Sequence, residues 1–212
     1  MPMKQQRFQN GIEHLSSTDP IMRELIQMYG DCRVPSRTDS FLVLCESIIS
    51  QQLSVKAAAS ICRRFMEYFH NQPTDRLILS APEDELRALG LSYSKIKYLK
   101  DLALHHGDGR LEFEEMGGMS NEEIIDRLIQ VKGIGRWTAE MFLIFGLGRF
   151  DVFPVDDLGI KKAIQFNYGL ADLPGKDEMR AIGQAWAPYE SIASLYLWRS
   201  LNNKPPIEKS VK

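Results

Sequence analysis

The sequence has 212 residues, of which 44% are hydrophobic and 25% are charged, and its formal net charge is −2. This length and composition are typical of one large or two small packed globular domains, and they exclude intrinsic disorder for most of the chain. A sequence pI of about 6.1 excludes a protein that coats nucleic acid through bulk positive charge. Any contact with nucleic acid must therefore be local.

The sequence pattern also argues against membrane and disulfide-rich proteins. No apolar run is long enough to span a bilayer, and the N-terminal residues lack the apolar stretch of a signal peptide. We therefore expect an intracellular protein, in the cytoplasm and nucleoid or in the nucleus, with no membrane partner. Cys32, Cys45 and Cys62 are odd in number and widely spaced, which favours free buried thiols over disulfides or a metal site.

The first helix is expected after a polar N-terminal segment. Residues 1–10 are polar, and we expect them to lack regular structure. Asp19 followed by Pro20 has the order of an N-cap and a first helical residue. This pair predicts a helix that ends at Gly30, because glycine readily adopts the conformation that terminates a helix.

Two helices are expected next, with a polar junction between them. Residues 41–50 form a strongly apolar helix that Asp39 or Ser40 can cap, and this helix is expected to be central to the core. A second helical pattern covers residues 55–69. The junction Ser50–Leu53 interrupts both patterns with polar side chains, and a glutamine pair that caps helix ends is one interpretation of it.

Helix start signals recur in the middle of the chain. Acidic residues that follow Ser80 predict a helix ending at Gly90, and a further helix is expected over residues 95–106. Ser120 with Glu123 has the spacing of a capping box, in which each side chain bonds the backbone of the other residue. This pair predicts the start of another helix.

A tight turn with two glycines separates the helical patterns of residues 124–130 and 136–147. Gly133 and Gly135 allow the backbone to approach a ligand without interference from Cβ atoms. The free amides at the start of the second helix suit a phosphate group, so the segment predicts a helix-hairpin-helix that binds DNA backbone. The cations near this turn and the next helix in sequence are Lys132, Arg136, Lys161 and Lys162. They either contact DNA or are ordinary solvated helix charges.

Two adjacent carboxylates precede the next helical pattern, residues 158–166. Asp156 and Asp157 follow a connection that contains Pro154, which would turn the chain back. A carboxylate here would then lie near the DNA strand that the hairpin holds. Either carboxylate could be a simple N-cap. Two more helices are expected over residues 176–186 and 189–201. We find no repeat and no strand pattern, so the predicted fold class is all-α.

Three blocks of this sequence, in this order, resemble the helix-hairpin-helix superfamily of DNA glycosylases. They are residues 48–54, residues 133–157 and residues 186–198. The resemblance covers residues 38–201 and is closest to the branch typified by 3-methyladenine DNA glycosylase II. A glycine hairpin alone would be a weak signal, because non-catalytic DNA-binding modules also have one.

The resemblance implies one glycosylase unit over residues 1–212, built as two helical lobes with a cleft between them. The first lobe would span residues 38–110. The second would span residues 111–201 and carry the hairpin, residues 129–137, with the C-terminal helices packing back on the first lobe. Residues 202–212 would be a tail.

The resemblance also implies the activity of a monofunctional DNA-3-methyladenine glycosylase. Such an enzyme flips an alkylated purine out of double-stranded DNA and hydrolyses its N-glycosidic bond, which leaves an abasic site for base excision repair. The spacing to Ile160 in the family pattern selects Asp157 over Asp156 as the catalytic carboxylate. At a helix N-terminus this carboxylate is expected to stay ionised.

The remaining site residues are also implied by the resemblance. The base pocket would contain Trp137, Met141 and Trp198. DNA contacts would come from Gln52, Leu53, Lys132, Gly133, Gly135, Arg136 and Thr138, with Gln52 filling the gap left by the flipped nucleotide. The backbone carbonyls of Ile129, Val131 and Ile134 would bind a structural Na⁺ or K⁺. No catalytic cofactor is expected, nor an iron-sulfur cluster, because that needs four closely spaced cysteines.

Two other functions stay open at the level of sequence. A non-catalytic helix-hairpin-helix DNA-binding protein would need the hairpin but would leave Asp157, Gln52 and Trp198 without a purpose. A bifunctional glycosylase and lyase for oxidised bases would carry a lysine at the position of Trp137. We expect a monomer that acts on double-stranded DNA containing alkylated bases such as 3-methyladenine and 7-methylguanine.

Overall fold

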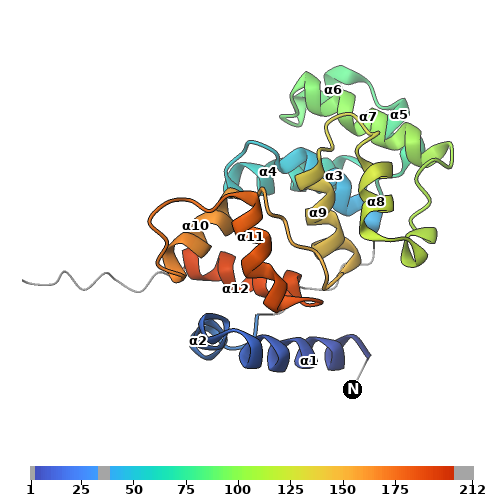
Figure 1. Cartoon of the computed structure of the whole chain (residues 1–212). Coiled ribbons are helices and arrows are strands. Elements are labelled where there is room, and N and C mark those ends of the chain that lie inside the picture. The colour runs from blue at the N-terminus through green and yellow to red at the C-terminus, as the bar shows by residue number, and fades with distance from the viewer. Residues whose placement is uncertain (1–2, 33–38, 203–212) are drawn as a thin grey trace, which may run out of the picture. The chain divides into compact units, whose positions relative to one another are not determined.

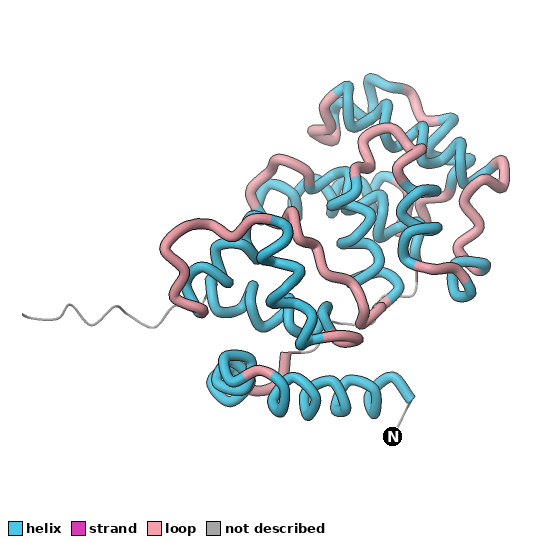
Figure 2. The backbone as a smooth tube through the Cα atoms, viewed as in Figure 1, coloured by secondary structure: helices cyan, strands magenta, loops and turns pink. Residues whose placement is uncertain are grey.

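The computed structural model describes residues 3–32 and 39–202, and within these ranges every regular element is a helix (Figure 2). The predicted all-α class is therefore confirmed. Two compact units are present, one formed by residues 1–35 with residues 148–212 and the other by residues 36–147. The continuous unit extends to residue 147, and within it the second hairpin helix packs against the helix of residues 40–50. The predicted tail from residue 203 onward lies outside the described residues.

The discontinuous unit combines two helices from the start of the chain with the helices that follow residue 157 (Figure 1). Its elements are α1 (Met3–Thr18), α2 (Pro20–Tyr29), α10 (Leu158–Asn167), α11 (Lys176–Gly183), the 3-10 turn η3 (Gln184–Trp186) and α12 (Glu190–Asn202). Helix α12 packs against α1, α2 and α10. The C-terminal helix therefore packs on residues 3–29, within its own unit.

The expectation that residues 1–10 lack regular structure is wrong, because α1 begins at Met3. Phe8 and Leu15 of this helix are buried in the same hydrophobic cluster as Ile192 of α12. A Cβ atom at Gly11 would collide with Ile192 and Tyr189, so α1 and α12 approach each other closely. The few apolar residues of α1 are therefore sufficient to bury one of its faces, although its average composition is polar.

The predicted cap at Asp19 is confirmed and has a second role. Its carboxylate accepts hydrogen bonds from the backbone N–H groups of Ile21 and Met22 at the start of α2. Its Oδ2 atom also accepts from Trp186 Nε1 at 2.8 Å and from the Tyr168 hydroxyl. Burial and this hydrogen bond raise the pKa of Tyr168. One buried carboxylate thus joins α2 to the end of α10 and to η3.

The continuous unit is built around the apolar helix predicted over residues 41–50. Its elements are α3 (Ser40–Ser50), α4 (Val55–Tyr68), α5 (Asp75–Ser80), α6 (Glu83–Ala88), α7 (Tyr93–Gly107), η1 (Glu115–Gly118), α8 (Asn121–Leu128), α9 (Arg136–Phe142) and the π-helical turn η2 (Leu143–Leu147). Helix α3 packs against α4, α7 and α9, and six of its residues are buried. Asp39 caps it through the N–H of Leu42.

Other expected caps are also present in this unit. Ser54 caps α4, and Ser120 with Glu123 forms a complete capping box at the start of α8. Cys45 and Cys62 are free, as is Cys32 in the other unit, but only Cys45 is buried as expected, and the other two are half-buried. Burial raises the pKa of Cys45. No helix in the described ranges is long and apolar enough to cross a membrane.

Candidate DNA-binding and catalytic site

The predicted catalytic residue, Asp157, is the N-cap of α10. Its carboxylate is buried, with 8% of the residue exposed, and its Oδ1 atom accepts the N–H of Ile160 at 2.7 Å. The family pattern selected Asp157 by its spacing to Ile160. In the structure this spacing has a local cause, because an N-cap side chain accepts a hydrogen bond from the third residue of its helix. Asp157 therefore combines burial with a fixed side-chain direction.

The neighbouring Asp156 has very different surroundings. Its side chain is 45% exposed, and its two oxygens pair with Lys176 at 2.8 Å and with Lys161 at 3.8 Å. Exposed ion pairs of this kind contribute little to stability and leave the carboxylate in water. The structure thus gives a physical reason to prefer Asp157, because a carboxylate interacts more strongly with developing charge when water is excluded.

Trp198 contacts Asp157 directly. The indole Nε1 of Trp198 in α12 donates a hydrogen bond of 3.0 Å to Oδ1 of Asp157, the oxygen that also caps α10. Gly159 makes this contact feasible, because a Cβ atom there would lie 2.9 Å from that oxygen and 3.3 Å from Cδ1 of Trp198. The sequence analysis missed Gly159. Its signal was a glycine inside a helical pattern, where alanine would favour the helix more.

The two glycines of the hairpin loop have different roles. Backbone conformation and space require glycine at residue 133, whereas Gly135 is the N-cap of the next helix. Gly133 has φ of +85°, and a Cβ atom there would overlap the ring of Tyr98 on α7. Gly135 has φ of −93° and is the N-cap of α9, with no side-chain cap. No heavy atom of the described chain lies within 4 Å of the position that its Cβ would take. The first-turn amides of α9 therefore adjoin open space at Gly135.

Two of the cations predicted to contact DNA form ion pairs inside the hairpin unit. The guanidinium of Arg136 bonds Glu122 through both terminal nitrogens and Glu140 through Nε, so it joins α8 to α9. The hydrogen bond to Glu122 raises the pKa of Arg136. Lys132 donates to Asp101 from its backbone N at 2.8 Å and from Nζ at 3.2 Å. Their contacts with DNA stay predictions.

Asp101 on α7 is a further residue that the sequence analysis missed. Burial opposes its ionisation, but the hydrogen bonds and positive charge of Lys132 outweigh burial and lower the pKa of the Asp101 carboxyl. Together with Tyr98, which packs under Gly133, it attaches the hairpin loop to α7. The contact joins residues 31 positions apart, so no local pattern indicated it.

The junction between α3 and α4 is a turn closed by a 3.3 Å hydrogen bond from Leu53 N to Ser50 O. Gln51 has φ of −52° and ψ of 133°, and Gln52 has φ of +55°, which together match a type II turn. Gln52 and Leu53 are both exposed, Leu53 to 37%. The pair is therefore available for contact, and its role with DNA stays a prediction.

The other predicted site residues lie on α9 or in the hairpin loop. Trp137 is 47% exposed, and Met141 is four residues further along α9, on the same helix face. Both belong to a different unit from Trp198, so the base pocket as a set stays a prediction. Thr138 is only 7% exposed, and its contact with DNA stays a prediction.

The monovalent cation expected on the hairpin carbonyls stays a prediction. Of the carbonyls of Ile129, Val131 and Ile134, only that of Val131 accepts a backbone hydrogen bond outside the helices of the described chain, from Ile134 N at 3.1 Å. Carbonyl oxygens suit Na⁺ or K⁺ because these ions are hard and weakly charged. In the described ranges no group of three or more acidic, histidine or cysteine side chains could hold a metal ion.

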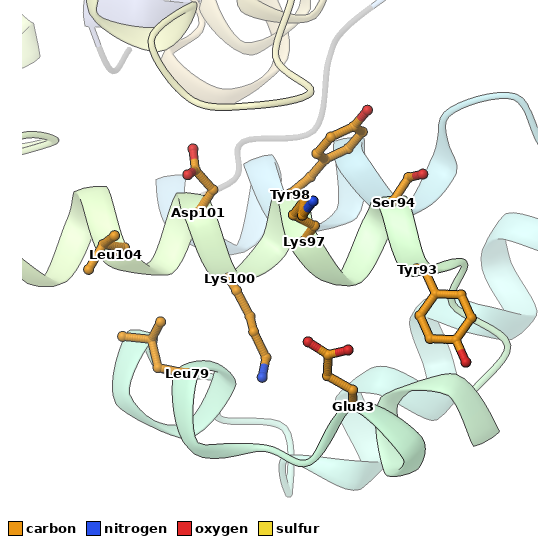
Figure 3. Close-up of a pocket in the computed structure, with 9 residues that line it drawn as sticks. All are labelled: Leu79, Glu83, Tyr93, Ser94, Lys97, Tyr98, Lys100, Asp101 and Leu104. Atoms are coloured by element: carbon orange, nitrogen blue, oxygen red, sulfur yellow. The ribbon is translucent and has the colours of Figure 1, made fainter.

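A pocket of about 680 Å³ opens beside α7, and it contains none of the predicted site residues (Figure 3). It is lined by Leu79, Glu83, Tyr93, Ser94, Lys97, Tyr98, Lys100, Asp101 and Leu104. Tyr98 and Asp101 point away from Lys100 and Leu79 across α7 (Figure 3). The side of α7 that carries Tyr98 and Asp101 is the side that holds the hairpin.

The described chain combines an all-α fold, a glycine hairpin whose second helix has no side-chain cap, and a buried carboxylate at the N-terminus of α10. A family model described as "HhH-GPD superfamily base excision DNA repair protein" matches residues 45–188. This match covers more than half of the chain. The chain therefore belongs to the HhH-GPD superfamily of base excision DNA repair proteins.

Several similar proteins within this superfamily are named as 3-methyladenine glycosylases. DNA-3-methyladenine glycosylase 1 of Schizosaccharomyces pombe is 38% identical over 194 residues, which cover 88% of this chain and 85% of the relative. The structure of the S. pombe 3-methyladenine DNA glycosylase Mag1 with abasic DNA has a TM-score of 0.83 at 36% identity, covering 92% of this chain and 98% of that one. A DNA-3-methyladenine glycosidase from Bacillus halodurans has a TM-score of 0.82 at 36% identity, covering 90% and 88%.

Proposed function

We propose that this protein is a monofunctional DNA-3-methyladenine glycosylase, which hydrolyses the N-glycosidic bond of alkylated purines in double-stranded DNA. The product is an abasic site, the substrate of the next step in base excision repair. The observation that carries the proposal is the buried carboxylate of Asp157, held at its Oδ1 by Ile160 N and Trp198 Nε1. Relatives at 36–38% identity that are named for this activity support the choice of substrate.

Asp157 would stabilise the positive charge that develops on the sugar. As the bond to the base lengthens, its electrons leave with the base and the sugar becomes cationic. A fixed carboxylate in a site without water interacts with this charge more strongly than solvent would. The same carboxylate would orient or deprotonate the water that attacks the sugar carbon.

The flipped base would be held by Trp137, Met141 and Trp198. An indole face attracts a cationic base by about 0.5–2 kcal/mol per contact. Purines alkylated at N3 or N7 are cationic and already have a weakened glycosidic bond. A pocket with few base-specific hydrogen bonds therefore suffices for bases of the 3-methyladenine and 7-methylguanine type.

The protein would anchor one DNA strand and fill the gap that the flipped nucleotide leaves. The amides near Gly133 and Gly135 would bind a phosphate, with Na⁺ or K⁺ on the carbonyls of Ile129, Val131 and Ile134 supplying positive charge beside it. The exposed Gln52 would fill the space left by the flipped nucleotide and bond the orphaned base. Leu53, Lys132, Arg136 and Thr138 complete the proposed contacts.

We also propose that the protein is a monofunctional hydrolase that acts as a monomer inside the cell. The superfamily's bifunctional members use a lysine amine at the position of Trp137. An indole nitrogen has its lone pair in the aromatic system and cannot attack the sugar. The attacking group would therefore be water.

The test is to incubate the purified protein with methylated double-stranded DNA and to identify released bases by chromatography. We expect 3-methyladenine and 7-methylguanine to appear with the wild-type protein and to be absent with Asp157→Asn. DNA binding without any released base would instead indicate a non-catalytic module. Release of oxidised bases with strand cleavage would favour the bifunctional class.

A further inference from the structure

Gln51 connects the junction turn to the hairpin. Its side-chain Nε2 donates a 2.8 Å hydrogen bond to the backbone carbonyl of Gly133, which lies 82 residues further along the chain. Both residues belong to the continuous unit and both are half-buried. This bond joins the turn that carries the proposed gap-filling residue to the loop that carries the proposed phosphate anchor.

The turn itself is held in a conformation that its sequence does not favour. Gln52 occupies the third position of the type II turn with φ of +55°, where glycine or asparagine is usual. A glutamine at positive φ costs free energy, so the surrounding contacts must impose this geometry. Because the Gln52 side chain is exposed, the geometry gains nothing from burial of that side chain. Such a conformation is typical of functional positions.

Helix α7 supports the turn and the hairpin from the same side. Lys95 donates from Nζ to the Ile49 carbonyl of α3 at 2.7 Å, just before the turn. Tyr98 packs under Gly133, and Asp101 accepts from the backbone N of Lys132. These three α7 residues are spaced by three positions and share one face of the helix, and Figure 3 shows Tyr98 and Asp101 on the same side. The Gln51 bond joins the turn to the loop directly, without the helix.

We propose that Gln51 is a positioning residue, which fixes the gap-filling turn at a set distance from the phosphate-binding loop. The inference rests on the proposed function. Once the hairpin holds a phosphate, the Gln51 bond places Gln52 at the nucleotide that leaves the stack. Without that bond the hairpin still binds DNA, but the turn enters the duplex less often and extrusion slows.

The test replaces Gln51 with methionine, which keeps the length of the side chain and removes the donor. We expect the single-turnover rate of base release to fall about tenfold, the effect of one well-placed hydrogen bond. Affinity for undamaged DNA should stay within about twofold of wild type, because that affinity depends on the anchor. Fluorescence of 2-aminopurine beside the target nucleotide should report extrusion slowed by the same factor. Gln51→Glu, which has no donor on its carboxylate, provides a second variant of similar shape.

A matched control is available in the other unit. Gln165 is also half-buried and donates from Nε2 to a backbone carbonyl, that of Ala171, at 3.1 Å. Gln165→Met should leave base release unchanged. In a Gln52→Ala background, Gln51→Met should cause no further loss, because no gap-filling side chain remains to be positioned.

Three results would overturn the inference. They are wild-type rates in both Gln51 variants, full additivity of Gln51→Met with Gln52→Ala, and an equal loss of affinity for undamaged DNA. The proposed function is tested separately. If wild-type protein extrudes the nucleotide but releases no base, the proposed function fails, and the fluorescence data still decide the role of Gln51.

Discussion

Asp156 and Asp157 are adjacent in sequence but have very different surroundings. Asp157 is buried and receives two hydrogen bonds on Oδ1, whereas Asp156 is exposed and pairs with lysines. Asp157→Asn should lower the rate of base release at least about a hundredfold, since preorganised electrostatic groups typically contribute that much. Asparagine is also a good N-cap, so α10 should stay intact. Single-turnover assays with methylated DNA measure the rate.

Asp156→Asn is the matched comparison for this prediction. Its loss of charge affects an exposed pair with Lys176 and should change the rate less than about threefold. Binding to lesion-containing DNA should be retained in both variants. A larger loss with Asp156→Asn than with Asp157→Asn would show that the carboxylates have been assigned in the wrong order.

Gly159 should separate stability from activity. Alanine usually favours a helix over glycine by about 1 kcal/mol, so Gly159→Ala should not unfold α10. Its methyl group, however, would stand 2.9 Å from Asp157 Oδ1 and 3.3 Å from Cδ1 of Trp198, and one of them must move. We expect about tenfold slower base release at an unchanged or higher melting temperature. A normal rate would show that the site accommodates the methyl group.

Gly175 provides the control for that substitution. It is the N-cap of α11 in the same unit, and none of the described atoms lies within 4 Å of its would-be Cβ. Gly175→Ala should leave base release at the wild-type rate. If Gly159→Ala and Gly175→Ala behaved alike, the effect would not depend on Trp198 and Asp157.

At the scale of elements, local signals predicted helix boundaries well. The N-caps Asp19, Ser54 and Asp157 and the capping box at Ser120 are all present, because each depends on a few neighbouring residues. Helix α1 was not predicted, because it is stabilised by contacts with α12 nearly two hundred residues away in sequence. The short helix α5 was not predicted either. The second hairpin helix also ends early and continues as the π-helical turn η2, which apolar periodicity does not distinguish from α-helix.

The site residues show the same difference between local features, which sequence can predict, and contacts between distant segments, which it cannot. Sequence pattern and family resemblance together located Asp157 and the glycine turn, since each is a local feature. They missed Gln51, Asp101 and Gly159, because these residues act through contacts between distant segments. The turn geometry at Gln52 was equally hidden, since glutamine gives no signal of positive φ.

The hairpin can be tested at Gly135 better than at Gly133. A larger residue at Gly133 would face both positive φ and the Tyr98 ring, so it would disturb folding as well as binding. Gly135→Ala meets no such obstacle, and its methyl group would project into the open space beside the amides of α9. We expect unchanged stability and about tenfold weaker binding to undamaged DNA, with lesion preference retained. Equal affinity in a fluorescence anisotropy titration would remove the hairpin from the interface.

At the scale of the whole molecule, a protein with a net negative charge would bind a polyanion through local contacts. The formal net charge is −2, and the hairpin residues Lys132 and Arg136 are engaged with carboxylates. Backbone amides carry no net charge and release no counterion of their own when they bind a phosphate. Each phosphate neutralised by a cation contributes a salt slope of about −0.9. Binding that relies on amides should therefore weaken only gently as salt rises.

Whether the enzyme is a hydrolase or a lyase depends on whether a lysine amine can attack the sugar. The family resemblance aligns Trp137 with the lysine of the bifunctional members, and the hairpin lysine, Lys132, pairs with Asp101 at 3.2 Å. Lys161 lies 3.8 Å from Asp156, so each of these two lysines is close to a carboxylate. We expect borohydride added during turnover to trap no covalent protein–DNA adduct, and strand breaks to appear only after alkali or an abasic-site endonuclease. An adduct that persists in wild-type protein and disappears on mutating Lys132 or Lys161 would contradict both hydrolysis by water and the choice of glycosylase branch.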